Sequence, residues 1–131
     1  MVRSNGFPDF DATVAHLVAL AEEAVVAVLH DLHRATSLRP TVEVDQWMES
    51  SVRISINRGY TAPSMFAPAK PEAFAEVADY FQEQLDQSGA GAWPVCKEHN
   101  AGLHAEVRDE TAVWRCRLGG HTVAAIGALD E

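Results

Sequence analysis

Two cysteine–histidine pairs constrain the fold of this chain more than any other feature. The sequence has only two cysteines, Cys96 and Cys116, and a histidine closely follows each of them, His99 and His121. Zinc takes four such sulfur and nitrogen ligands in a tetrahedron, and a short spacing lets one turn supply two of them. We therefore expect a zinc ion bound by Cys96, His99, Cys116 and His121.

Glycines and strand-like segments accompany both pairs. Gly102 follows the first pair, and Gly119 and Gly120 lie inside the second, where the backbone must turn tightly and its amides can point at a thiolate. Short alternating segments predict three antiparallel strands over residues 103–108, 111–118 and 122–129, with a turn at Asp109-Glu110.

Residues 91–131 resemble the zinc-ribbon and zinc-knuckle family, in which antiparallel strands join two metal-binding turns. They also resemble the C-terminal region of small uncharacterised bacterial proteins with a Trp-Pro-x-Cys-x-x-His segment followed by Trp-x-Cys, here at 93–99 and 114–116. A ribbon knuckle usually reads Cys-x2-Cys-Gly, and this chain has His99 in place of the second cysteine. The resemblance implies a zinc-ribbon-like module and no particular activity.

The fourth ligand has two candidates. His104 lies near the first pair and shares a strand face with Glu106, whereas His121 follows Cys116 on the same glycine-bearing turn. We favour His121 and keep His104 as the alternative metal ligand. Two other interpretations need no metal: buried cysteines can act as small apolar residues, and an exported chain could join them in a disulfide.

A catalytic metal is the competing interpretation. His104-Ala105-Glu106 matches the His-x-Glu of zinc deaminases, and residues 94–99 are a distorted version of their Pro-Cys-x-x-Cys segment. The two pieces occur here in the opposite order. A zinc-dependent hydrolase or deaminase-like enzyme, with an open metal position and Glu98 or Glu106 as general base, remains the alternative.

The first ninety residues predict a helix–hairpin–helix core. Apolar residues recur every three or four positions from 11 to 35 and predict one long helix. Its polar residues, Asp31 among them, fall largely off this apolar stripe, and alanines make a second face nearly as apolar. That second face needs a cover, and a homodimer through this helix is one way to provide it. Alternation over 42–57 predicts a β-hairpin, and Pro71 begins a second helix.

The remaining segments set the domain organisation. Residues 88–92 are a linker of serine, glycine and alanine. The expected fold is α+β: a core over 1–90 and the zinc-ribbon-like module over 91–131, packed as one globular unit. The segment 59–70 has no helical or strand period but carries Tyr60, Met65 and Phe66. We expect these three residues to bind a partner, or else to cap the core.

Net charge and hydropathy limit the classes of partner and the cellular location that we expect for this chain. The net charge of −9 disfavours nucleic acid and anionic membranes as partners. The sequence shows no membrane-spanning run and no secretory signal, so we expect a cytoplasmic protein. The favoured function is a small zinc-binding protein that acts as a protein-interaction module, of the adaptor, chaperone or immunity type.

Overall fold

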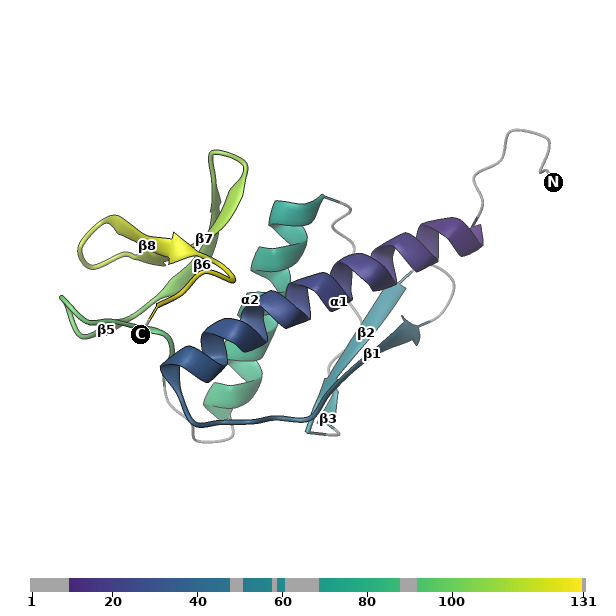
Figure 1. Cartoon of the computed structure of the whole chain (residues 1–131), viewed down its shortest axis with the longest axis horizontal. Helices are drawn as coiled ribbons and strands as arrows, with labels where there is room; N and C mark the ends of the chain where they lie inside the picture. Colours follow the sequence, from purple (N-terminus) through teal and green to yellow (C-terminus); the bar gives the residue numbers. More distant parts are fainter. Residues whose placement is uncertain (1–9, 48–50, 58, 61–68, 88–91, 131) are drawn as a thin grey trace.

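The structure is a computed structural model that describes residues 10–47, 51–57, 59–60, 69–87 and 92–130. Two helices lie between two three-stranded antiparallel sheets (Figure 1), and a two-stranded pair accompanies the second of them, which confirms the predicted α+β class. The elements are α1 (Phe10–Ala35), β1 (Val42–Trp47), β2 (Ser51–Ile56), β3 (Gly59–Tyr60), α2 (Lys70–Gln87), β4 (Val95–Cys96), β5 (Ala101–Gly102), β6 (His104–Arg108), β7 (Thr111–Cys116) and β8 (His121–Ala125).

The first helix buries two faces. The predicted stripe packs against α2 and the first sheet, and its fully buried members include Ala21, Val28 and Leu32. The helix ends where the Thr36 side chain and amide both donate to the Leu32 carbonyl oxygen. Asp31 lies off this stripe and is nevertheless fully buried, because the chain's own C-terminal segment covers the second face of α1.

The first sheet is a meander in the order β1-β2-β3. Its register places the alternating apolar residues opposite one another, as in the pair Val44–Ile54. On the other face, Arg53 donates to Asp45, its cross-strand neighbour, at 3.2 Å. Strand β3 was not predicted, because two residues are too few to show a period.

The second helix, predicted to begin at Pro71, contacts both three-stranded sheets. Val77, Phe81 and Leu85 are buried against α1. The Tyr80 hydroxyl donates to the Ile54 carbonyl oxygen at 2.9 Å and ties α2 to the first sheet. Strands β6 and β7 contact the same helix. Neither helix of the described chain has the length and apolar character needed to cross a lipid bilayer.

The C-terminal sheet has the order β6-β7-β8, with β7 in the centre and Trp114 fully buried on it. The β6–β7 turn is the predicted one: Asp109 and Glu110 both have positive φ, as a two-residue hairpin turn with the twist of its strands requires. Strand β8 is shorter than predicted. It ends at Ala125, because Gly127 has φ 100° and redirects the chain towards α1.

A buried carboxylate joins this sheet to α1. Asp31 accepts hydrogen bonds from the Trp114 indole nitrogen at 2.7 Å and from the backbone amides of Gly127 and Leu129 at 2.6 and 3.0 Å. A side chain at Gly127 would also meet Ala27 of the helix, since an added Cβ would lie 2.9 Å from the Ala27 Cβ. The C-terminal sheet is thus fixed to the end of α1 by directed hydrogen bonds as well as by apolar packing.

Candidate metal centre

The turn that carries Cys96 and His99, hereafter the first knuckle, spans residues 95–102. Strands β4 and β5 pair antiparallel, and the turn between them closes when the Asn100 amide donates to the Cys96 carbonyl oxygen at 2.6 Å. Asn100 has φ 53°, a left-handed conformation that asparagine tolerates well. The glutamine Gln82 of α2 fixes the base of the knuckle, because its side-chain amide donates to the carbonyl oxygens of Trp93 and Leu103 at 2.8 Å each.

The second knuckle, residues 116–121, repeats this backbone pattern at the β7–β8 turn. The Gly120 amide donates to the Cys116 carbonyl oxygen at 2.8 Å, and Gly120 has φ 68°. In both turns the residue four positions after the cysteine is left-handed and closes the turn on the cysteine carbonyl. The Gly119 amide also donates to the Cys116 sulfur at 3.3 Å.

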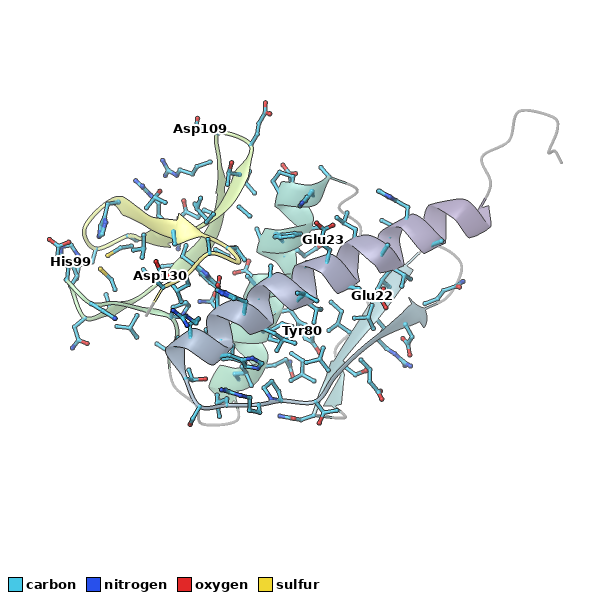
Figure 2. The ribbon with its side chains drawn as sticks, viewed as in Figure 1. Glu22, Glu23, Tyr80, His99, Asp109 and Asp130 are labelled. Carbon is cyan, nitrogen blue, oxygen red and sulfur yellow. The ribbon has the colours of Figure 1, made fainter. Side chains whose placement is uncertain are left out.

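The two knuckles face each other and bring four side chains together. The sulfurs of Cys96 and Cys116 each lie 3.5 Å from Nδ1 of His99, and the Cys96 sulfur lies 3.6 Å from Nε2 of His121. All four potential ligand atoms lie within 4.8 Å of one another. Both cysteines are buried and both histidines are half-buried. Figure 2 shows His99 at the extreme end of the molecule, far from the start of α1. This cluster could hold a metal ion.

Gly119 provides the space that His99 occupies. It stands three residues after Cys116, as His99 stands three residues after Cys96. A Cβ at Gly119 would collide with the His99 ring, with 2.7 Å to Nδ1 and 2.8 Å to Nε2. The second knuckle therefore carries no ligand at this position and supplies His121 two residues later instead.

The cluster favours an ionised Cys96. Burial opposes ionisation, but hydrogen bonds from the His99 side chain and amide, the His121 side chain and the Glu98 amide outweigh it and lower the pKa of Cys96 to about 6. A thiolate is the form that binds metal.

His104 and Glu106 lie outside the cluster. His104 is exposed on β6, opposite Arg115 of β7. Glu106 accepts from Arg117 at 2.9 Å and from Arg108 at 3.3 Å, and the hydrogen bond from Arg117 is the main reason why its pKa is lowered. An anion held between two guanidinium groups is a weak base, so the structure does not assemble the deaminase-like arrangement.

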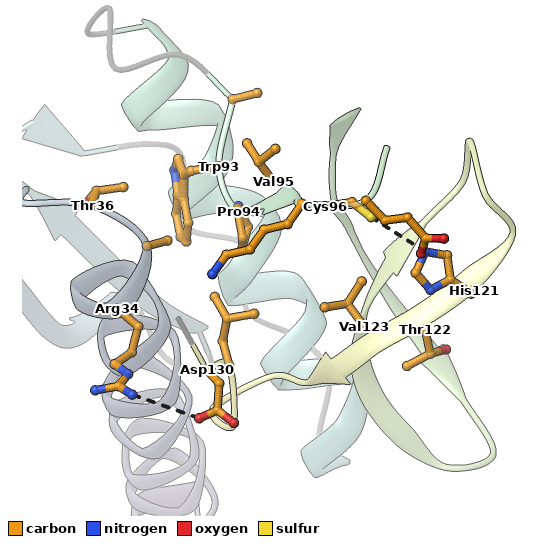
Figure 3. Close-up of a pocket in the computed structure, with 15 residues that line it drawn as sticks. Arg34, Thr36, Trp93, Pro94, Val95, Cys96, His121, Thr122, Val123 and Asp130 are labelled. Carbon is orange, nitrogen blue, oxygen red and sulfur yellow. Dashed lines mark hydrogen bonds and ion pairs between the residues drawn. The ribbon is translucent and has the colours of Figure 1, made fainter. Parts of the chain in front are cut away.

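An open cavity adjoins the cluster (Figure 3). Its volume is about 640 Å³, and Cys96 and His121 form part of its wall. Glu98 also lines it. The cavity was not predicted, because its walls come from three segments that are far apart in the sequence.

The predicted partner-binding residues are only partly described. Tyr60 belongs to β3, and its backbone pairs with Ser55 of β2. Met65 and Phe66 lie outside the described residues. Comparison with protein-family models, with curated proteins and with solved structures gives no significant match.

Proposed function

We propose that this protein binds one zinc ion through Cys96, His99, Cys116 and His121. The main support for this proposal is the spacing of the four candidate ligand atoms. With Zn–S of about 2.3 Å and Zn–N of about 2.0 to 2.1 Å, a tetrahedral ion separates sulfur from nitrogen by about 3.5 Å. Three of the four sulfur–nitrogen distances, 3.5, 3.5 and 3.6 Å, match that edge, and all four ligand atoms lie within 4.8 Å of one another. Two thiolates and two imidazoles are also a donor set that suits zinc.

The proposed role of the zinc is structural. Four protein ligands complete a tetrahedron and leave no position for a reacting water, whereas catalytic zinc keeps one position open. The ion would join two short turns that share few apolar contacts of their own. Structural zinc contributes its binding free energy to folding in such modules.

The protein itself would act by binding another protein in the cytoplasm. An adaptor, a chaperone or an immunity protein needs a stable, shaped surface and no reactive group. The cavity beside the cluster supplies such a surface, and the net charge of −9 favours a basic protein over a nucleic acid. Zinc thiolates also persist best in a reducing compartment, which supports a cytoplasmic location.

The first experiment measures metal. Protein purified without a histidine tag should carry one equivalent of zinc by elemental analysis, and X-ray absorption should report two sulfur and two nitrogen neighbours. Well under one equivalent, with no uptake of added zinc, would show that the proposal is wrong.

Substitutions then test the ligand set. Cys96→Ser and His121→Ala should each lower zinc affinity strongly. His104→Ala is the matched control, since His104 lies on a strand of the same sheet but outside the cluster, and it should leave affinity unchanged. A larger loss with His104→Ala than with His121→Ala would assign the fourth ligand to β6.

One observation keeps the zinc hydrolase as a second candidate. Glu98 lines the cavity that also borders Cys96 and His121, so a general base would stand beside the metal if one histidine left it. X-ray absorption decides between the two: three protein ligands and one light oxygen neighbour would favour the enzyme.

A further inference from the structure

The cavity beside the cluster is built from three parts of the chain. One part is the end of α1 with the residue after it, Arg34 to Thr36. The second is residues 92–98, the first knuckle and its approach, and the third is residues 121–123 and 129–130, from β8 and the segment after it. Two of these walls contain proposed zinc ligands, Cys96 and His121. The Cys96 sulfur lies 3.6 Å from Nε2 of His121, so the ion would join these two walls of the cavity where they meet.

Apolar side chains stay accessible in this cavity. Val95 and Val123 are 40 % and 39 % exposed, and both line the cavity. A β-bulge places Val123 there: Trp114 pairs with Ala124 and Arg115 with Thr122, so Val123 is the extra residue of β8. Bulges near binding sites commonly redirect a side chain in this way.

Trp93 adds an unused hydrogen-bond donor. Its ring lines the cavity and packs edge-on against Trp114, with ring centroids 5.7 Å apart. The side chain is only 4 % exposed, and its indole N–H finds no acceptor within the described part of the chain. A buried donor without a partner is destabilising, and an incoming carbonyl oxygen would satisfy it.

The charged residues around the cavity indicate what charge a bound group should carry. Arg34 and Lys97 are balanced by Asp130 and Glu98, and Arg34 lies 4.0 Å from Asp130 (Figure 3). The cavity therefore suits an uncharged group, while the net charge of −9 of the whole chain attracts positive charge from further away. An apolar centre inside a polar rim is the arrangement of a protein-binding pocket.

We propose that this cavity binds a segment of a partner protein in which one large apolar side chain is flanked by basic residues. The apolar side chain contacts Val95 and Val123, and a backbone carbonyl of the segment accepts from the Trp93 indole. This inference rests on the proposed function, because zinc fixes two walls of the cavity.

Short random linear peptides displayed on phage are the probe, selected on the zinc-loaded full chain. Enriched peptides should carry one large apolar residue among basic ones, and fluorescence anisotropy should then give their Kd. Val123→Glu should weaken binding at least about tenfold by placing a charge against the apolar residue. Trp93→Phe should weaken it roughly threefold to tenfold by removing one hydrogen bond.

Val107→Glu is the matched control, since Val107 is a valine of similar exposure, 37 %, on β6 and outside the cavity. It should bind the peptides as the unaltered chain does. Zinc content and melting temperature are measured for each variant, and if Val123→Glu does not fold, Trp93→Phe decides.

In the peptide experiment, any of three results would overturn the inference: no enriched peptide, enriched peptides without the apolar and basic residues, or peptides that bind Val123→Glu and Trp93→Phe with unchanged Kd. The last result would place protein binding elsewhere on the surface. Self-association that Val123→Glu abolishes would make a second copy of the chain the occupant, which also overturns it. A chain that holds no zinc fails the proposed function first, so the two failures are separable.

Discussion

At the scale of single residues, the candidate centre depends on one pair, His99 and Gly119. The His99 imidazole reaches both sulfurs because its ring occupies the space that a side chain on Gly119 would fill. The same glycine donates its amide to the Cys116 sulfur. Gly119, which is not itself a candidate ligand, therefore determines the position of the His99 ring.

Gly119→Ala should displace the His99 ring and lower zinc affinity by about 10- to 100-fold, the loss typical when the support of a metal ligand is removed. Competition with a chromogenic chelator measures this. Gly120→Asn is the control, since no atom lies within 4 Å of an added Cβ there and asparagine tolerates the positive φ. Equal losses in the two variants would mean that the turn, and not the His99 contact, is sensitive.

The lowered pKa of Cys96 predicts how stability depends on pH. Its pKa is about 6 in the folded chain and about 9 for a free thiol, so folding favours the thiolate. This stabilisation is complete above about pH 9 and disappears as the pH falls through about 6. In metal-free protein, the difference in unfolding free energy between the native sequence and Cys96→Ser should therefore grow as the pH rises across this window. Urea unfolding in the presence of a chelator measures it, and a constant difference would contradict it.

At the scale of secondary-structure elements, Asp31 joins α1 to the C-terminal sheet. Its two carboxylate oxygens accept from Trp114, Gly127 and Leu129, which belong to β7 and to the segment after β8. The His30 imidazole lies 2.8 Å from the same carboxylate. Three donors that converge on one buried acceptor fix both the position and the orientation of the sheet.

Asp31→Ala should lower the free energy of unfolding by about 3 to 5 kcal/mol, because it leaves several buried donors without an acceptor. Asp130→Ala should cost less than about 1 kcal/mol, since Asp130 is 96 % exposed and its ion pair with Arg34 spans 4.0 Å. Chemical denaturation of both variants tests the contrast. A mild effect of Asp31→Ala would mean that apolar packing alone holds the sheet.

Local sequence patterns predicted the secondary-structure elements well, but they did not predict the contacts between those elements. Period and turn chemistry were sufficient for both helices, the first hairpin and the Asp109-Glu110 turn, because these depend on neighbouring residues. The burial of Asp31 could not be predicted, since its donors lie 83, 96 and 98 positions away. The two-residue strands β4 and β5 were missed for the opposite reason: they are too short to show alternation.

Part of the candidate centre could also be predicted from the sequence, because each half of it is formed by neighbouring residues. Short spacing placed each cysteine and its histidine in one turn, and the structure brings both pairs together. The role of Gly119 became visible only when the two knuckles faced each other. Reading Gly119 as the counterpart of His99 would have required the two turns to be aligned on their cysteines.

At the scale of the whole molecule, we expect the core to stay folded when the metal is removed. The helices and the first sheet bury their own apolar residues, and the C-terminal sheet keeps its bonds to Asp31 without any ion. Chelation should therefore increase hydrogen exchange in residues 95–102 and 116–121 and leave α1, α2 and β2 protected. Exchange followed by mass spectrometry tests this, and loss of protection throughout the chain would contradict it.

The long separation between Asp31 and its donors has a consequence for synthesis. A ribosome completes α1 well before it adds Trp114, Gly127 and Leu129, so a nascent chain carries a carboxylate whose three native donors do not yet exist. Burial of the Asp31 carboxylate without its donors is unfavourable. We therefore expect the face of α1 that carries Asp31 to stay exposed to solvent until residue 129 has been added. On this basis, we expect the first helix to be among the last elements to reach its native surroundings.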